Sequence, residues 1–217
     1  MAIVPYEVDV PMSRWPYANW VIIGVTSLAF LLAFAGDVRL LELEPLILYR
    51  GNPSGIIGHM LLHGGWLHIV GNMVFLWTFG NAVCAKVTNI AYPVIYLGLG
   101  AMSAIIHLII DGDPAVGASG AINGIIGMYL VFYPQNEVTC LWWIIFRAGT
   151  FAVSSIWMIL FWLAFDIWGA WSGAGGVAYW AHLGGFFSGF ALASSMLWLG
   201  WVEMTETETS IYDLMSR

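Results

Sequence analysis

Charged residues are scarce in this chain. Of its 217 residues, 9% are Asp, Glu, Lys or Arg and 60% are hydrophobic, which is unlike a soluble globular domain. Only six residues are Lys or Arg and the net charge is −7, so the clustered basic surface that nucleic-acid binding needs is missing and no nucleic-acid partner is expected. The scarcity of charge predicts a protein that lies in a lipid bilayer.

Cysteine is equally rare, with Cys84 and Cys140 as the two in the chain. Two thiols do not form the disulfide framework that is typical of small secreted domains. No basic stretch precedes the first apolar run, so we expect no cleaved secretory signal. What remains is the class of multi-pass membrane proteins.

Long apolar runs dominate the chain. A bilayer core about 30 Å thick requires roughly 20 apolar residues per helix, and about six such segments are present, so we expect one all-α, six-helix membrane domain over residues 17–200. The expected spans are residues 17–36, 56–82, 90–110, 119–134, 151–168 and 177–199. The fourth covers only about 24 Å, so Ser119 at its start should lie below one membrane surface.

The segments between and outside the spans carry most of the charge. We expect residues 1–16 to form a short non-spanning lead, residues 37–55 and 135–149 to lie at the membrane interface, the second of them as a hairpin, residues 169–176 to form a flexible Gly-rich loop, and residues 201–217 to be a solvated acidic tail.

The few basic residues indicate an orientation. Four of them (Arg14, Lys86, Arg147 and Arg217) fall on the side of the N-terminus, against Arg39 and Arg50 on the other. Because cytoplasmic loops are enriched in Lys and Arg, cytoplasmic termini are favoured. We expect a bacterial inner membrane protein whose connections bearing Asp111, Asp113 and Asp166 face outward.

A turn of small residues, Gly117-Ala118-Ser119-Gly120, opens the fourth span. A serine between Ala and Gly at a helix start is sterically open and close to backbone N–H groups, so a substrate carbonyl could reach its hydroxyl. The alternative is that Ser119 caps the helix, while Gly117 and Gly120 let neighbouring helices pack closely.

His182, near the outward end of the sixth span, is the best candidate for the base that a nucleophilic serine needs. Small residues share one face of each of the two helices concerned, which would let them approach and bring Ser119 and His182 to hydrogen-bond distance. These seams are Gly120, Gly124 and Gly127 on the fourth span, and Ala181, Gly185 and Gly189 on the sixth. We expect no acidic residue within the spans to complete a triad, so the pair would act as a dyad.

His68 and Asn72 stand four residues apart on the second span and therefore point the same way. With the backbone N–H of Ser119 they could form an oxyanion hole, and the alternative is that they make interhelical hydrogen bonds. His59 and His63 form a similar pair that could bind a metal. A structural or interfacial role fits these two better because no third ligand lies in the spans, so we expect neither metal nor cofactor.

These motifs resemble the rhomboid intramembrane serine proteases. They are Gly117–Gly120, Ala181–Phe186 with Gly189, and His63–Met73. The resemblance implies a bundle of six helices around a short central catalytic helix, and a Ser–His dyad that cuts transmembrane helices of other proteins. It implies Ser119 as nucleophile, His182 as base, His68 and Asn72 as oxyanion donors, and Gly117 as the turn that exposes Ser119; Gly120 and Gly185 support the site.

The chain departs from the family pattern at Asn123, where many members have a tyrosine on which the base stacks. Asn123 would orient His182 by hydrogen bonding to a ring nitrogen or a cavity water, or would pair with another helix. The end of the second span and the first loop also differ, since the Gly-x-x-x-Glu pattern of relatives reads Gly80–Cys84 here and the Trp-Arg pair is missing.

The resemblance predicts an intramembrane serine endopeptidase that cuts transmembrane protein substrates near the outer face. Substrate would enter between the fifth and second spans, with residues 169–176 as a mobile cap. The alternatives are a non-catalytic membrane adaptor on the same fold and a histidine-ligated haem or metal bundle.

Overall fold

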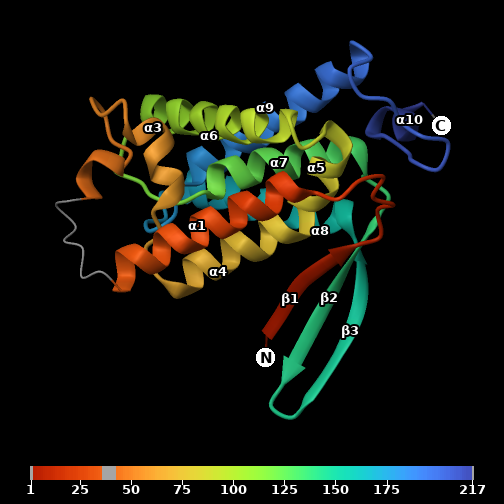
Figure 1. Ribbon diagram of the computed structural model, residues 1–217, viewed down its shortest axis with the longest axis horizontal. Coiled ribbons are helices and arrows are strands. Elements are labelled where there is room, and N and C mark those ends of the chain that lie inside the picture. The colour runs from red at the N-terminus through yellow and green to blue at the C-terminus, as the bar shows by residue number, and fades with distance from the viewer. Residues whose placement is uncertain (1, 36–42, 217) are drawn as a thin grey trace.

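The computed structural model describes residues 2–35 and 43–216, and most of them are helical (Figure 1). Its helices are α1 (Tyr17–Ala35), η1 (Glu44–Leu46), α3 (Gly55–Gly58), η2 (His59–Leu61), α4 (Trp66–Phe75), η3 (Leu76–Gly80), α5 (Asn81–Val87), α6 (Ala91–Ile110), α7 (Ser119–Phe132), α8 (Ser155–Ser172), α9 (Tyr179–Trp198) and α10 (Ile211–Met215).

Four helical stretches among the described residues are long and apolar enough to cross a membrane: 17–34, 66–87, 91–110 and 155–172. The second stretch is α4, η3 and α5 in succession, with a π-helical turn in the middle. α7 is shorter, at 14 residues, and is the central helix, because all its residues from Gly120 to Phe132 except Asn123 are buried. The chain is thus a membrane helical bundle around a short core helix.

The expected second span begins too early. The spanning helix starts at Trp66, and η2 ends before it at Leu61, after which the backbone of Leu62 is extended. Gly64 and Gly65 follow, and glycine has a high entropic cost in a helix. His59 and His63 therefore precede the spanning helix and do not share a helix face.

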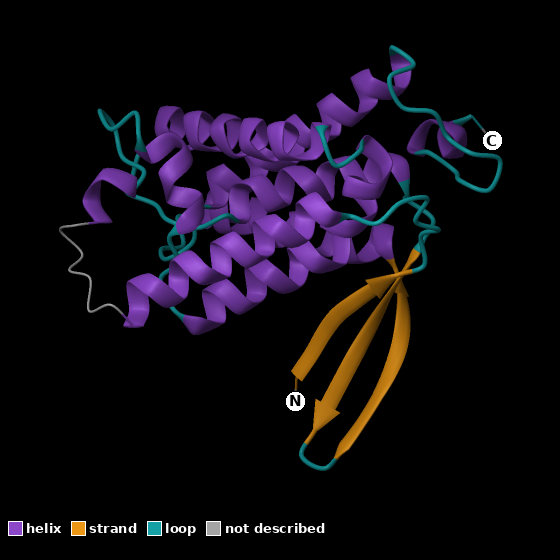
Figure 2. Cartoon of the chain, viewed as in Figure 1, coloured by secondary structure: helices purple, strands orange, loops and turns teal. Residues whose placement is uncertain are grey.

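The fold is not all-α, because three strands form an antiparallel sheet in the order β1-β2-β3. The strands are β1 (Ala2–Val8), β2 (Glu137–Ile144) and β3 (Arg147–Ser154). Figure 2 shows the sheet projecting from one end of the bundle. β-branched and aromatic residues such as Val138, Thr139 and Trp142 favour strands, which explains why this segment leaves the helical pattern.

Three expected boundaries differ from those in the structure. The interfacial hairpin is confirmed as a hairpin, but it continues to Ser154, so the fifth helix starts at Ser155 and not at residue 151. The lead is not a separate segment, since β1 pairs with β2 from Ala2↔Trp143 to Val8↔Val138. At the other end of α8, the helix runs on to Ser172, so the loop expected over residues 169–176 starts only at Gly173, whose φ of 64° ends the helix.

α7 and α9 approach each other closely along their glycines, as the small-residue seams predict. A Cβ atom added to Gly185 would overlap the carbonyl oxygen of Gly120, and one added to Gly189 would overlap that of Gly124. At Gly127 it would overlap the carbonyl of Phe186. Only glycine permits this backbone contact, which fixes the depth of α9 relative to α7.

The segment expected over residues 37–55 is described from residue 43 onward; residues 37–42, with Arg39, lie outside the described residues. The described part holds η1 and a turn in which Leu48 is buried and pairs with Ala115. Side-chain contacts also fix it, because Arg50 Nε donates to the carbonyl of Leu108 at 3.0 Å. This segment packs against the end of the bundle that holds the start of α7.

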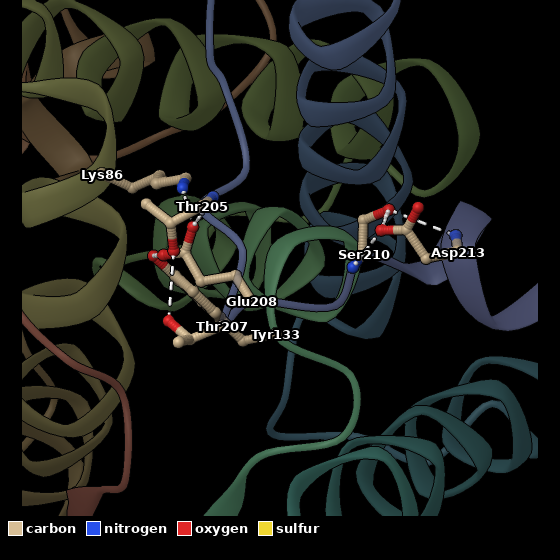
Figure 3. Close-up of polar contacts among 7 residues, drawn as sticks. All are labelled: Lys86, Tyr133, Thr205, Thr207, Glu208, Ser210 and Asp213. Carbon is tan, nitrogen blue, oxygen red and sulfur yellow. Dashed lines mark hydrogen bonds and ion pairs between the residues drawn. The ribbon is translucent and has the colours of Figure 1, made fainter.

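The acidic tail is docked and not simply solvated (Figure 3). Glu208 pairs with Lys86 of α5 and accepts hydrogen bonds from the hydroxyl of Tyr133 at 3.1 Å and from the N–H of Thr205 at 2.8 Å. Its side chain is only 6% exposed. Because Tyr133 directly follows α7, the tail covers the end of α7 opposite Ser119.

Candidate active site

Ser119 is the first residue of α7, and the residue before it, Ala118, occupies the cap position. The reading of Ser119 as a helix cap is therefore wrong. Gly117 has a φ of 126°, and a Cβ atom there would lie 2.7 Å from Nε2 of His68. Both the left-handed backbone and the close approach of the imidazole require glycine at this turn.

The Ser119 hydroxyl is in contact with His182. Nε2 of His182 lies 2.9 Å from Oγ of Ser119, the distance of a hydrogen bond. The two residues come from helices α7 and α9, whose glycine seam brings their backbones together beside this pair. The predicted proximity of Ser119 and His182 is present in the structure.

Asp166 makes a contact that the sequence reasoning missed. Oδ1 of Asp166 lies 3.0 Å from Nδ1 of His182, on the opposite side of the ring from Ser119. The expectation that no acid stands within the spans is wrong, because Asp166 falls inside the expected span of residues 151–168 and lies well inside α8. The sequence feature that could have identified Asp166 is a carboxylate in an apolar helix, since such groups are costly in a membrane and are kept for a function.

His68 and Asn72 lie on α4 and face the same cavity as Ser119. Nδ1 of His68 accepts a hydrogen bond from the N–H of Gly64 at 3.2 Å, so the ring proton of the neutral form is on Nε2 and available as a donor. The side-chain nitrogen of Asn72 is buried and has no hydrogen-bond partner within the described ranges. Two side-chain donors therefore line the same cavity as Ser119.

The cavity that joins these groups has a volume of about 720 Å³ and is walled by α4, α7, α8 and α9. Its polar lining is His68, Asn72, Ser119, Asn123, Asp166 and His182. Aromatic rings line the side between α4 and α8, where Phe75 and Trp162 meet edge to face with centroids 5.5 Å apart. A polar floor and an apolar wall suit an extended peptide that carries large apolar side chains.

Asn123 also lines the cavity, but its amide nitrogen donates to the carbonyl of Ser119 at 3.0 Å. In the part of the chain that the structure describes, no hydrogen bond joins Asn123 to His182, and none pairs it with another helix. Asn123 therefore closes the first turn of its own helix. Its role in orienting His182 stays a prediction.

His59 and His63 are not arranged as a metal site. Nδ1 of His59 bonds the carbonyl of Gly55 at 2.9 Å, and the carbonyl of His59 accepts from the N–H of Gly117 at 2.9 Å, which ties η2 to the turn before Ser119. The ring of His63 packs edge to face on that of His68. Over residues 2–35 and 43–216, no three His, Cys, Asp or Glu side chains form a group that could hold a metal ion.

The chain matches a known family over most of its length. The model of the Rhomboid domain matches residues 50–199. Rhomboid protease GluP of Bacillus subtilis is 26% identical over 173 residues, which is 80% of this chain and 31% of that protein. RHOMBOID-like protein 6, mitochondrial, of Arabidopsis thaliana is 31% identical over 156 residues, 68% of this chain and 46% of that protein.

A further relative is Rhomboid protein 1, mitochondrial, of Saccharomyces cerevisiae, at 25% identity over 154 residues, 65% of this chain and 41% of that protein. The chain thus spans between about a third and a half of the length of these curated relatives. All the groups that meet at the cavity fall within the matched range of residues 50–199.

Proposed function

The chain belongs to the rhomboid family, and on that premise we propose that it is an intramembrane serine endopeptidase that cleaves transmembrane segments of other membrane proteins. The observation that carries this proposal is the 2.9 Å contact between Oγ of Ser119 and Nε2 of His182 inside a cavity large enough for a peptide. A serine hydroxyl hydrogen-bonded to an imidazole is the pairing that acyl transfer requires.

The proposed chemistry follows from that contact. The hydroxyl oxygen of Ser119 attacks the peptide carbonyl carbon while its proton passes to Nε2 of His182. The carbonyl electrons move to the oxygen, and the collapse of this intermediate expels the amine, which takes the proton from His182. Water then attacks the acyl group on Ser119, again with His182 as base, and releases the second product.

The negative oxygen formed in the first step needs donors. Three are proposed: the backbone N–H of Ser119, which is free of intrahelical bonding at the first position of α7, the Nε2–H of His68 and the side-chain N–H of Asn72. The orphaned nitrogen of Asn72 supports this role, because a buried donor without a partner is costly unless a ligand or water uses it.

We propose that α7 and α9 join the four longer stretches to make six membrane helices. At 14 residues, α7 is about 21 Å long and shorter than a bilayer core of about 30 Å, so Ser119 would lie below the outer surface. Water would reach it through the cavity. The aromatic wall between α4 and α8 is the proposed side for a substrate helix to enter, with the residues after Gly173 as the cap.

The proposed orientation has cytoplasmic termini in a bacterial inner membrane. The described basic residues Arg14 and Lys86 and the hairpin with Arg147 support it, since they belong to the end of the bundle that bears the sheet and the tail (Figure 1). Arg217 lies outside the described residues.

A serine-reactive fluorophosphonate tests the proposal. The wild-type protein in detergent should be labelled and should cleave a reporter that contains a transmembrane segment, whereas Ser119→Ala should do neither and His182→Ala should lose several powers of ten in rate. Both variants should keep the wild-type melting temperature. A wild-type protein that binds the reporter helix without labelling or cleavage would instead be an adaptor.

A further inference from the structure

We propose that Asp166 is a positioning residue for the reaction: its carboxylate holds His182 in the tautomer and orientation that accept the proton of Ser119. This inference rests on the proposed function, because it assigns a part in the same proton transfer. It adds a third member to a pair that the chain's sequence motifs present as a dyad.

The two ring nitrogens of His182 contact Asp166 and Ser119 respectively. Nδ1 of His182 lies 3.0 Å from Oδ1 of Asp166, and Nε2 lies 2.9 Å from Oγ of Ser119. A carboxylate only accepts hydrogen bonds, so Nδ1–H of His182 is the donor to Asp166. In the neutral ring, Nε2 then carries a free lone pair directed at the hydroxyl of Ser119, which is the tautomer that a general base needs.

Burial makes this contact significant. The side chains of His182 and Asp166 are only 15% and 12% exposed, and both line the cavity. Among the described residues, His182 is the only ion-pair or hydrogen-bond partner of the Asp166 side chain, and no Lys or Arg contacts it. A carboxylate kept inside an apolar helix without a basic partner has a high desolvation cost, which a purely structural contact between two helices does not explain.

The packing of α8 on α9 is built to allow the contact. Gly169 stands three residues after Asp166, on the same side of α8. A Cβ atom at Gly169 would overlap the ring of Tyr179, which begins α9 one turn before His182. The missing side chain lets the two helices lie close enough for the short Asp166 side chain to reach the imidazole.

The contact between Asp166 and His182 stabilises the positive charge that the imidazole gains during the reaction. When Ser119 loses its proton to Nε2, the ring of His182 becomes a cation that keeps its Nδ1–H bond to Asp166. The carboxylate stays ionised and stabilises that cation, and it takes up no proton itself. The same bond persists when His182 passes its Nε2 proton to the departing amine, so the ring does not need to turn between steps.

Asp166→Asn is the decisive variant. It is nearly isosteric, but its amide can donate to Nδ1 and so stabilise the tautomer that blocks Nε2. We expect kcat on a transmembrane reporter to fall about 10²-fold or more, with KM within about twofold of wild type. Asp166→Ala should fall similarly, and Asp166→Glu, which restores a carboxylate, should recover part of the loss.

Asp113→Asn is the matched control. It removes the same charge from an exposed position at the Ser119 end of the bundle that does not line the cavity, so kcat should not change. Nitrogen NMR of histidine-labelled protein gives a readout besides activity, with His182→Gln to assign the signal. Wild type should show a proton on Nδ1 of His182, and Asp166→Asn should move it to Nε2.

The outcomes separate this inference from the function on which it rests. If Ser119→Ala abolishes cleavage while Asp166→Asn keeps wild-type kcat and an unchanged histidine spectrum, the positioning role is wrong and the protease assignment stands. A loss in Asp166→Asn that follows a fall in melting temperature and that Asp166→Glu does not relieve would also overturn it, in favour of a link between helices. If the wild type neither labels nor cleaves, both proposals fail.

Discussion

At the scale of single residues, His68 and Asn72 each bring a hydrogen-bond donor to the cavity that Ser119 lines. Nε2 of His68 faces the turn at Gly117, and the amide nitrogen of Asn72 is buried without a partner in the described chain. As the proposed oxyanion donors, both groups would gain a partner in the negative oxygen of the transition state. Their contribution should therefore appear in the transition state more than in substrate binding.

We accordingly expect His68→Ala and Asn72→Ala each to lower kcat by about 10²–10³-fold, because one lost oxyanion donor costs that much while others remain. KM should change little, and steady-state kinetics on one reporter would separate the two constants. Val70→Ala on the same helix is the control, since this exposed side chain does not line the cavity. A variant that raises KM alone would make that residue a substrate-binding group.

Asn123 should contribute less to kcat than its position four residues after Ser119 suggests. Its amide nitrogen donates to the carbonyl of Ser119 in its own helix, while Oδ1 of Asp166 contacts Nδ1 of His182. We expect Asn123→Ala to lower kcat by less than about tenfold. Asn123→Tyr, which restores the commoner family residue, should keep measurable activity. A loss of 10²-fold or more in Asn123→Ala would return the orienting role to this amide.

Some residues of the candidate site could be predicted from the sequence and others could not. Four of the site residues could be predicted from local sequence. Small residues surround Ser119 and His182, and the spacing of four residues places His68 and Asn72 on one helix face. Asp166 escapes that reading because its partner is 16 positions away on another helix. Only the packing of α8 against α9 brings the two together, and no periodicity within either helix reports it.

At the scale of elements, the seam between α7 and α9 determines whether the pair can meet. Gly185→Ala adds one methyl group that would overlap the carbonyl of Gly120, so the helices must separate. We expect a lower melting temperature together with lost activity, and a larger effect for Gly185→Leu.

Gly98→Ala on α6 is the control for this substitution, because open space surrounds its added Cβ. It should leave the melting temperature unchanged or slightly raised, since alanine favours a helix over glycine by about 1 kcal/mol. A Gly185→Ala protein as stable as Gly98→Ala would show that the seam is not tightly packed.

Elements were predictable where hydrophobicity alone sets their length. α6 and α9 have nearly the expected bounds, because each is a continuous apolar run between turn residues. The sheet was not predictable in the same way. An apolar run with β-branched and aromatic residues, such as β2, has the same hydropathy as a helix, and it becomes a strand here because β1 and β3 satisfy its backbone on both sides.

At the scale of the whole molecule, contacts of Glu208 with Lys86 and Tyr133 hold the acidic tail against the bundle. Burial opposes ionisation of Glu208, but hydrogen bonds from Lys86 and Thr205 and the charge of Lys86 outweigh it and hold the pKa of this carboxyl below its ordinary value. A lowered pKa stabilises the docked tail at neutral pH, and that stabilisation is lost as the pH falls below the usual glutamate range and through the lowered value.

The protection of the amides of residues 201–216 against hydrogen exchange, measured relative to the intrinsic exchange rate at each pH, should therefore decrease at acid pH in the wild type. Glu208→Gln should show the faster exchange already at neutral pH, because it leaves Lys86 without its counter-charge. Glu206→Gln, a change of the same charge at an exposed position in the same tail, is the control and should exchange like wild type. Equal exchange in the two variants would mean that the ion pair does not hold the tail.

The pairing of β1 with β2 also sets the order in which the molecule can be completed during synthesis. Ala2 pairs with Trp143, so β1 cannot pair until the chain has been made as far as β2. The hairpin of β2 and β3 can form locally, whereas the register of β1 requires closure of a very long loop. Until then the backbone of β1 is unpaired, and in that interval this strand is most open to pairing with another chain.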